Sequence, residues 1–108
     1  MISNERLEKA LTFIAESDRE FAEAKTEVER ATWLAKQTRA IQYELADGKS
    51  IEDKKQAVER SSKVNDAEDR RIKAIGVYEY LRAKRASEEI IIQVWRSIEA
   101  SRRKETVS

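Results

Sequence analysis

Residues that interrupt helices are almost absent from this chain of 108 residues. It has no proline and two glycines, of which only Gly48 lies among turn-forming residues, in the stretch 46–50. Proline and glycine are the strongest local breakers of regular structure. Because 40% of the residues are charged and alanine is frequent, the composition is typical of long helices and coiled coils. The sequence therefore predicts an all-α chain with one firm turn.

The first predicted helix spans about residues 4–46. Asn4 can cap its start, and Gly48 can supply the left-handed residue that follows its end. Its apolar and small residues recur at steps of three, four or seven, as expected for one face of a helix. This predicted seam consists of Leu7, Leu11, Ile14, Phe21, Ala24, Val28, Ala31, Leu34, Ile41 and Leu45.

A short helix is predicted next, over about residues 51–62. Ser50 is a capping residue, and Asp53 three positions later forms a weak version of the capping box. Ile51 and Val58 would lie on one side of this helix. The short helix therefore belongs to the connection that follows the first long helix.

The stretch 62–66 is poor in apolar residues and rich in side chains that compete for backbone hydrogen bonds. We expect a break or kink there, with Asn65 as a new capping residue. A second long helix is predicted over about residues 66–103. Gly76 costs that helix about 1 kcal/mol relative to alanine, and it could allow another backbone to come close.

The two long helices, about 4–46 and 66–103, have nearly equal lengths. A long antiparallel helical hairpin, with the short helix in its connection, is therefore the most economical fold, as a single domain over residues 1–108. The numbers of facing residues then sum to about 112. This register predicts contacts of Trp95 with Phe13, Ile14 and Phe21, and of Trp33 and Leu34 with Tyr78 and Leu81.

Two helices form a core that is one layer thick, which barely offsets the entropy lost on ordering the chain. We therefore predict a homo-oligomeric helical bundle, most simply a dimer of two hairpins. The residues expected in the core or the oligomer interface are Phe13, Ile14, Phe21, Trp33, Leu34, Tyr78, Leu81, Ile91, Trp95 and Ile98. Which of Trp33, Tyr43 and Tyr80 stay exposed for binding is left open.

Most residue types that build active sites are missing. The chain has no histidine or cysteine, and it shows no glycine-rich loop or nucleophile–base set. Four acidic residues share one helix face, and we interpret them as a solvated face rather than a metal site because basic residues are interspersed. They are Glu16, Glu20, Glu23 and Glu27. We expect no enzymatic activity, metal, cofactor or small-molecule substrate.

The charge and hydropathy of the chain limit which partners it can have and where in the cell it can act. The chain has 22 basic and 21 acidic residues, so no global field attracts nucleic acid or a membrane. Residues 65–108 carry 10 basic and 8 acidic side chains, which makes this part slightly basic. The longest apolar run, residues 90–92, is far shorter than the roughly 20 residues of a membrane span. We expect a cytoplasmic protein without a membrane partner.

Basic residues nevertheless form clusters along the chain. They are Lys54 with Lys55, Arg70 and Arg71 with Lys73, Arg82 with Lys84 and Arg85, and Arg96 with Arg102, Arg103 and Lys104. On a helix Arg96 and Arg103 share a face, so the last cluster could follow a phosphate backbone. Cations also stabilise a helix C-terminus through its dipole, whatever the protein binds. Trp95 could stack on a base, but its place in the apolar seam favours core packing.

The stretch from Phe21 to Lys104 resembles a family of small helical proteins from tailed bacteriophages and prophages. The resemblance is carried by residues 22–25, 36–39, Tyr43, Lys49 with Ser50, and most clearly by residues 94–103. That last segment is similar to the family's ending of tryptophan-arginine-serine, glutamate-alanine and arginine. Where the family often has a proline at the second break, this chain has Asn65 and Asp66.

Genes of that family commonly lie beside those of single-strand annealing and single-strand binding proteins. The resemblance implies a non-enzymatic accessory to phage DNA recombination or replication, acting in the bacterial host cell. Its partner would be single-stranded DNA, a phage recombination protein or a host factor. The basic cluster of Arg96, Arg102, Arg103 and Lys104 is the site that we expect to bind this partner. The alternative is a protein-interaction module, such as a phage-encoded inhibitor of a host protein or an assembly adaptor.

Overall fold

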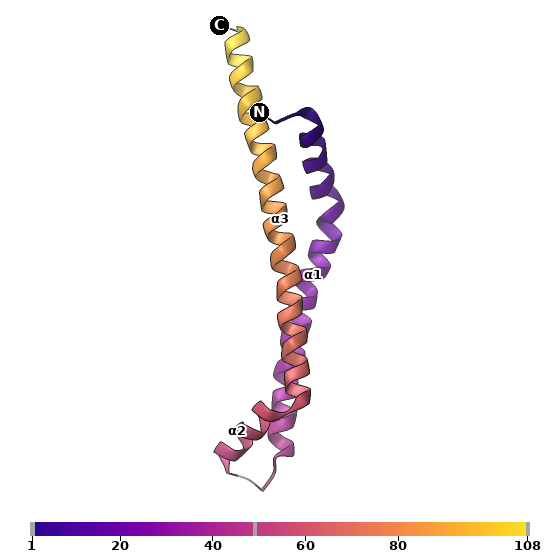
Figure 1. Cartoon of the computed structure of the whole chain (residues 1–108), viewed down its shortest axis with the longest axis vertical. Coiled ribbons are helices and arrows are strands. Elements are labelled where there is room, and N and C mark those ends of the chain that lie inside the picture. Colours follow the sequence, from indigo (N-terminus) through magenta and orange to yellow (C-terminus); the bar gives the residue numbers. More distant parts are fainter. Residues whose placement is uncertain (1, 49, 108) are drawn as a thin grey trace. The chain divides into compact units, whose positions relative to one another are not determined.

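A computed structural model describes residues 2–48 and 50–107 of the chain, which form three helices (Figure 1). They are α1 (Asn4–Leu45), α2 (Ile51–Arg60) and α3 (Ser62–Val107). The long helices α1 and α3 pack against each other as a hairpin, and α2 lies in the connection between them. The predicted all-α hairpin is therefore confirmed.

Local hydrogen bonds explain where α1 begins and ends. Ser3, rather than the predicted Asn4, caps the helix, because the Ser3 hydroxyl accepts a hydrogen bond from the backbone N–H of Arg6 at 3.1 Å. Gly48 has a φ of 79°, which confirms the left-handed residue predicted after the helix. Lys49, which belongs to the same predicted turn, lies outside the described residues.

The short helix α2 begins as predicted, but the break after it lies elsewhere. The Ser50 side chain accepts a hydrogen bond from the N–H of Asp53 at 3.2 Å. Ser61 alone separates α2 from α3, so the break that was predicted near 62–66 lies one residue earlier, and the predicted cap at Asn65 was wrong. The N–H of Ser61 donates to the carbonyl of Val58, and the Ser61 carbonyl accepts from the N–H of Asn65. One extended serine thus ends one helix and starts the next, which leaves Asn65 inside α3.

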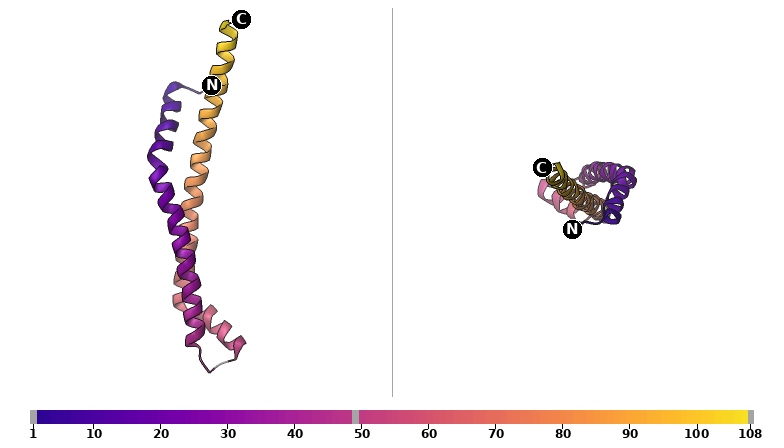
Figure 2. Two further views of the ribbon diagram at one scale, coloured as in Figure 1. Left: turned by 180° about the vertical axis from the view of Figure 1, so that it is seen from behind. Right: turned by 90° about the horizontal axis from the view of Figure 1, so that it is seen from above.

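The described chain divides into two compact units, each containing a part of both long helices. Unit 1 comprises Met1–Ala22 and Glu79–Ser108, and unit 2 comprises Glu23–Tyr78, which includes α2. In unit 1 the start of α1 and the end of α3 lie at the same end, and α3 continues past the start of α1 (Figure 1 and Figure 2). The helices of unit 1 are therefore antiparallel, with an uncovered end on α3.

The register of the helices differs from the predicted one. In unit 1 the side chain of Arg6 pairs with Glu88, and the ammonium of Lys84 lies 4.5 Å from the centre of the Phe13 ring. The predicted register had placed Trp95 at Phe13 instead. The residue numbers of these facing pairs sum to 94 (6 + 88) and 97 (13 + 84) rather than about 112. The reason is that polar contacts such as Arg6 with Glu88, rather than the large apolar residues, set the register of unit 1.

Small residues, rather than the large apolar ones, form the buried seam of α1. Ala10, Ser17, Ala24 and Ala31 recur at every seventh position, and each is buried. The large members of the predicted seam lie at its margins or face solvent, because small side chains let two helices approach closely. In particular Leu11, Ile41 and Leu45 are exposed.

The predicted core residues are covered to different extents. Leu81 is buried, and Trp33 is 59% exposed, so Trp33 does not pack within a single hairpin. The remaining predicted core residues are half-buried: Phe13, Ile14, Phe21, Leu34, Tyr78, Ile91, Trp95 and Ile98. Gly76 is exposed, and nothing lies within 4 Å of a side chain placed there, so no described part of the chain approaches it. Homo-oligomerisation stays a prediction.

Candidate nucleic-acid interface and the ion pairs that hold the helices

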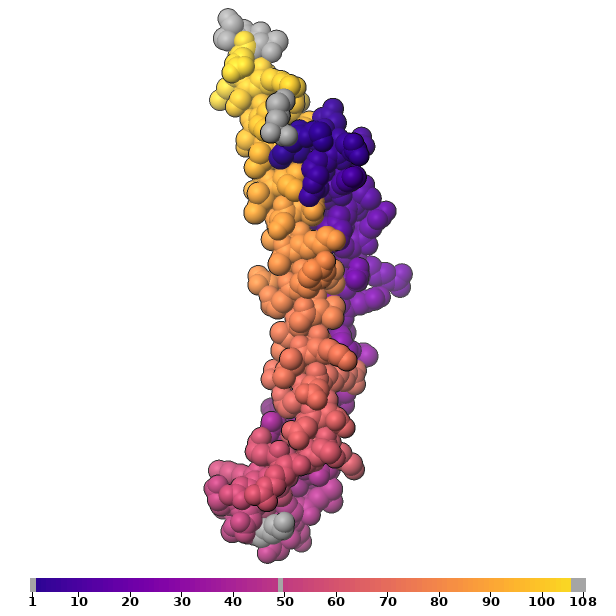
Figure 3. Space-filling view, in the orientation of Figure 1, coloured from indigo at the N-terminus to yellow at the C-terminus, as the bar shows by residue number. Residues whose placement is uncertain are grey.

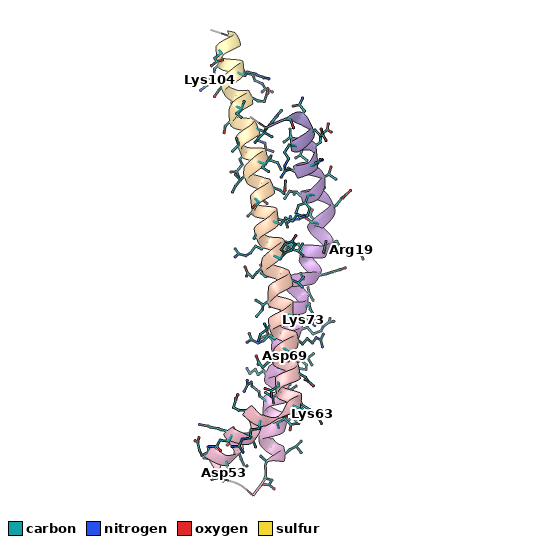
Figure 4. The ribbon with its side chains drawn as sticks, in the orientation of Figure 1. Arg19, Asp53, Lys63, Asp69, Lys73 and Lys104 are labelled. Carbon is teal, nitrogen blue, oxygen red and sulfur yellow. The ribbon has the colours of Figure 1, made fainter. Side chains whose placement is uncertain are left out.

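All four residues of the predicted binding site lie at the C-terminal end of α3. Arg96, Arg102, Arg103 and Lys104 are exposed, and Figure 4 labels Lys104 on the part of α3 that extends past the start of α1. The space-filling view shows the same end standing clear of the first residues of α1 (Figure 3). The structure therefore brings the four residues together on one accessible helix end. We call this cluster the basic end.

The basic end has an excess of positive charge. The stretch 96–105 contains these four cations and only two carboxylates, those of Glu99 and Glu105. Arg102 donates a hydrogen bond to Glu99 at 3.1 Å, one turn away on α3. In the described part of the chain no salt bridge involves Arg96, Arg103 or Lys104. The partial negative charge of the helix C-terminus lies beside these cations and stabilises them.

The other basic clusters of the sequence mostly serve the fold. In unit 2 Arg70 pairs with Glu27 of α1 at 2.8 Å. In the α1–α2 part of the same unit, the ammonium of Lys54 lies 5.2 Å from the centre of the Tyr43 ring. Exposed contacts of this kind stabilise a fold only weakly one by one. Their side chains are nevertheless engaged within the hairpin, unlike most of the basic end.

Arg85 makes the most extensive contact between the helices of unit 1. Its guanidinium donates hydrogen bonds to the carbonyl of Ile14 at 3.0 Å, to the hydroxyl of Ser17 at 2.7 Å and to the carboxylate of Asp18 at 2.7 Å. The same group lies 5.0 Å from the centre of the Phe21 ring. The Arg85 side chain is only 14% exposed. Arg85 therefore acts as a clamp that fixes α3 on α1.

Two further arginines hold their helices through carboxylates. In unit 1 Arg6 forms two parallel hydrogen bonds of 2.8 Å with Glu88, and this pairing lowers the pKa of Glu88. In unit 2 hydrogen bonds from Arg71 and then from Arg39 lower the pKa of Glu68. Arg39 also pairs with Glu59 of α2, which connects α1 with α2 and α3.

Sequence reasoning placed Arg85 in a basic surface cluster and did not identify this clamp. A signal was present, because Arg85 and Glu88 follow Leu81 at steps of four and three, which is the spacing of a helix seam. Charged residues at seam positions indicate contacts across the helix interface. The corresponding partners on α1, Ser17 and Asp18, lie where the predicted apolar seam is interrupted.

No protein-family model, curated protein or solved structure matches this chain. The resemblance to a phage family therefore stays a prediction. Within residues 2–48 and 50–107, no helix is long and apolar enough to cross a membrane. The same residues contain no group of three or more potential metal ligands.

We predict that Arg85→Lys destabilises the hairpin by about 2 kcal/mol. A lysine cannot bond the Ile14 carbonyl, Ser17 and Asp18 together, and bonds from charged donors each contribute about 1.5–3 kcal/mol. Urea denaturation followed by circular dichroism measures the loss. Arg82→Lys is the matched control, because Arg82 is 60% exposed and pairs with Glu79 of its own helix. Equal stability of both variants would contradict the clamp.

We also predict that stability falls as the solution is acidified. The pKa of Glu88 is lower in the folded chain than in the unfolded one, where it is about 4.3. The contribution of Glu88 to folding stability is therefore fully present above the pKa of the unfolded chain. It is lost as the pH falls through the pKa of the folded chain. Thermal melts between pH 7 and pH 3, compared for wild type and Glu88→Gln, should show a shallower decline in the variant. The exposed neighbour Glu89→Gln is the control, and identical profiles for all three proteins would refute this role of Glu88.

Proposed function

We propose that this protein is a non-catalytic accessory protein that binds nucleic acid through the basic end of α3. The observation that carries the proposal is the position of Arg96, Arg102, Arg103 and Lys104. They lie in the last part of α3 with exposed side chains, and α3 continues past the start of α1 (Figure 1). A phosphate backbone is recognised chiefly by such accessible cations.

The use of arginine elsewhere in the chain supports this assignment. Arg6, Arg39 and Arg85 bind carboxylates on neighbouring helices, so their charges are engaged in holding the hairpin. Among the described residues, no salt bridge joins Arg96, Arg103 or Lys104 to another helix, and Arg102 pairs with Glu99 of its own helix.

The length and charge of the basic end suit a single strand better than a structured duplex site. Residues 96–104 cover about 12 Å of helix at 1.5 Å per residue, which spans only a few phosphates. Binding would be weak for one chain and independent of base sequence. A role beside single-strand annealing proteins in phage recombination or replication, which the family resemblance implies, agrees with such binding.

The test is binding to fluorescent single-stranded DNA at a series of salt concentrations. We expect the wild-type protein to bind, and its affinity to fall steeply as the salt concentration rises. In a variant with Gln at residues 96, 102, 103 and 104, the slope of log K against log salt should decrease in magnitude by about 2–3. This value follows because each phosphate contact contributes about 0.7 to the slope. The matched control removes four exposed cations elsewhere, at Lys25, Arg30, Lys36 and Lys63. Binding that is absent, independent of salt, or equally reduced in both variants would refute the proposal.

The second candidate function is a protein-interaction module, such as an inhibitor of a host protein or an assembly adaptor. The observation that favours it is Trp33, which is 59% exposed on α1 in unit 2. Exposed tryptophans are enriched among the residues that dominate protein interfaces. A lack of DNA binding by the wild-type protein would leave this candidate as the better supported one.

A further inference from the structure

A second heptad seam runs along α3, within unit 1, on the side away from α1. Its residues follow one another at steps of three and four, and each of them is exposed. We call this set the outer seam: Tyr80, Ala83, Ser87, Ile90, Val94, Ser97 and Ser101. The clamp residue Arg85 and the buried Leu81 lie on the opposite side of the same helix, facing α1. One helix therefore carries two faces with coiled-coil spacing.

The outer seam is unusual because it is uncharged. In a chain where 40% of the residues are charged, none of its seven positions holds a charge. Its largest members are well exposed, with Tyr80 at 64%, Ile90 at 59% and Val94 at 43%. The hydroxyl of Ser87 donates to the carbonyl of Ala83 at 3.1 Å, so this serine needs no polar partner from another molecule. The seam therefore offers an uncharged surface in which Ile90 and Val94 are the large aliphatic residues.

The accessible area of the chain indicates how much surface awaits a partner. The chain exposes 8286 Å², whereas a folded monomer of its mass, 12.5 kDa, exposes about 6200 Å². A two-helix fold leaves much of each helix uncovered, so the chain has area enough for one subunit's share of an obligate homodimer interface, about 1000–2500 Å². The net charge of +1 also opposes self-association very little.

We propose that a second copy of this chain covers the outer seam, with the two α3 helices packed antiparallel about a two-fold axis between Ser87 and Ile90. The heptad register then pairs each large residue of one copy with a small residue of the other. Ile90 faces Ser87, Val94 faces Ala83, and Tyr80 faces Ser97. This inference does not rest on DNA binding, and the outer seam adjoins the basic end only at Arg102, which lines the same depression as Ser97 and Ser101.

The alternation of large and small residues selects the antiparallel arrangement. In a parallel pair identical positions face each other, so Ile90 would meet Ile90 and Ser87 would meet Ser87, which leaves crowded layers beside underpacked ones. A parallel pair would also place the two basic ends side by side. The antiparallel pair avoids both problems.

Two features around the seam agree with this arrangement. Ser97 and Ser101 line a shallow depression on α3, about 340 Å³ in volume, which can receive the Tyr80 ring of the other copy. The two charged residues that flank the seam, Glu79 and Lys84, would face uncharged Ala100 and Ile91 of the other copy. No like charges are therefore opposed along the interface.

The first test is the mass in solution by light scattering at tens of micromolar protein. We expect a dimer for wild type, and for Ser87→Glu at least a tenfold higher dimer dissociation constant, because two carboxylates would be buried next to the axis. Glu89→Arg is the matched control, since it changes a charge at an exposed position of α3 outside the seam and should leave the dimer intact. A monomeric wild type, or a Ser87→Glu dimer as tight as wild type, overturns the proposal.

The second test reads the direction of the helices and uses the absence of native cysteine. Ala83→Cys and Val94→Cys proteins are mixed in equal amounts, allowed to exchange subunits and oxidised. The antiparallel dimer predicts mainly the mixed disulfide between residue 83 of one chain and residue 94 of the other, identified by mass spectrometry. Mainly symmetric 83–83 and 94–94 disulfides would show a parallel pair. Glu89→Cys is the control outside the seam, and a yield of the mixed disulfide no higher than the yield of the Glu89→Cys disulfide would show another interface. Either result overturns the proposal.

Discussion

The close packing of α1 on α3 through small residues is the constraint on which the rest of the structure depends. Ala10, Ser17, Ala24 and Ala31 are buried, but alanine and serine bury little apolar surface, so this seam alone contributes little free energy. Polar contacts across the interface, above all the Arg85 clamp, therefore specify how the helices align. The large apolar residues that a thicker core would contain are left at the margins or in solvent.

Much of this architecture follows from the sequence, and the errors have identifiable causes. The turn at Gly48 and the cap at Ser50 were predictable because left-handed backbone and capping oxygens require particular residue types. The break at Ser61 was not, since a single serine that ends one helix and caps the next resembles ordinary helical sequence. The register of unit 1 was not predictable either, because polar contacts such as Arg6 with Glu88 set it, and Lys84 rather than Trp95 lies at Phe13.

The periodicity of apolar residues also could not show which of two faces of one helix packs within the hairpin. Both faces of α3 repeat at steps of three and four, and on α1 the small buried residues are interleaved with larger exposed ones such as Leu11. A pattern of apolar residues identifies helix faces that tend to be buried, but it does not show whether the same chain or another chain buries them. The charged residues resolve this for α3, because Arg85 and Glu88 reach α1 while the outer seam contains no charge. The four residues of the basic end lie near one another on α3, since a helix fixes which neighbours share its surface, and their role in binding stays a prediction.

We propose that the hairpin, whose buried seam on α1 consists of small residues, gains part of its stability from a second copy of the chain. The most direct measurement is the midpoint of thermal unfolding over a hundredfold range of protein concentration. The account predicts that the midpoint rises with concentration, since folding and association are then linked. A midpoint that is independent of concentration, together with a monomeric mass, would show that one chain is stable alone and would contradict it.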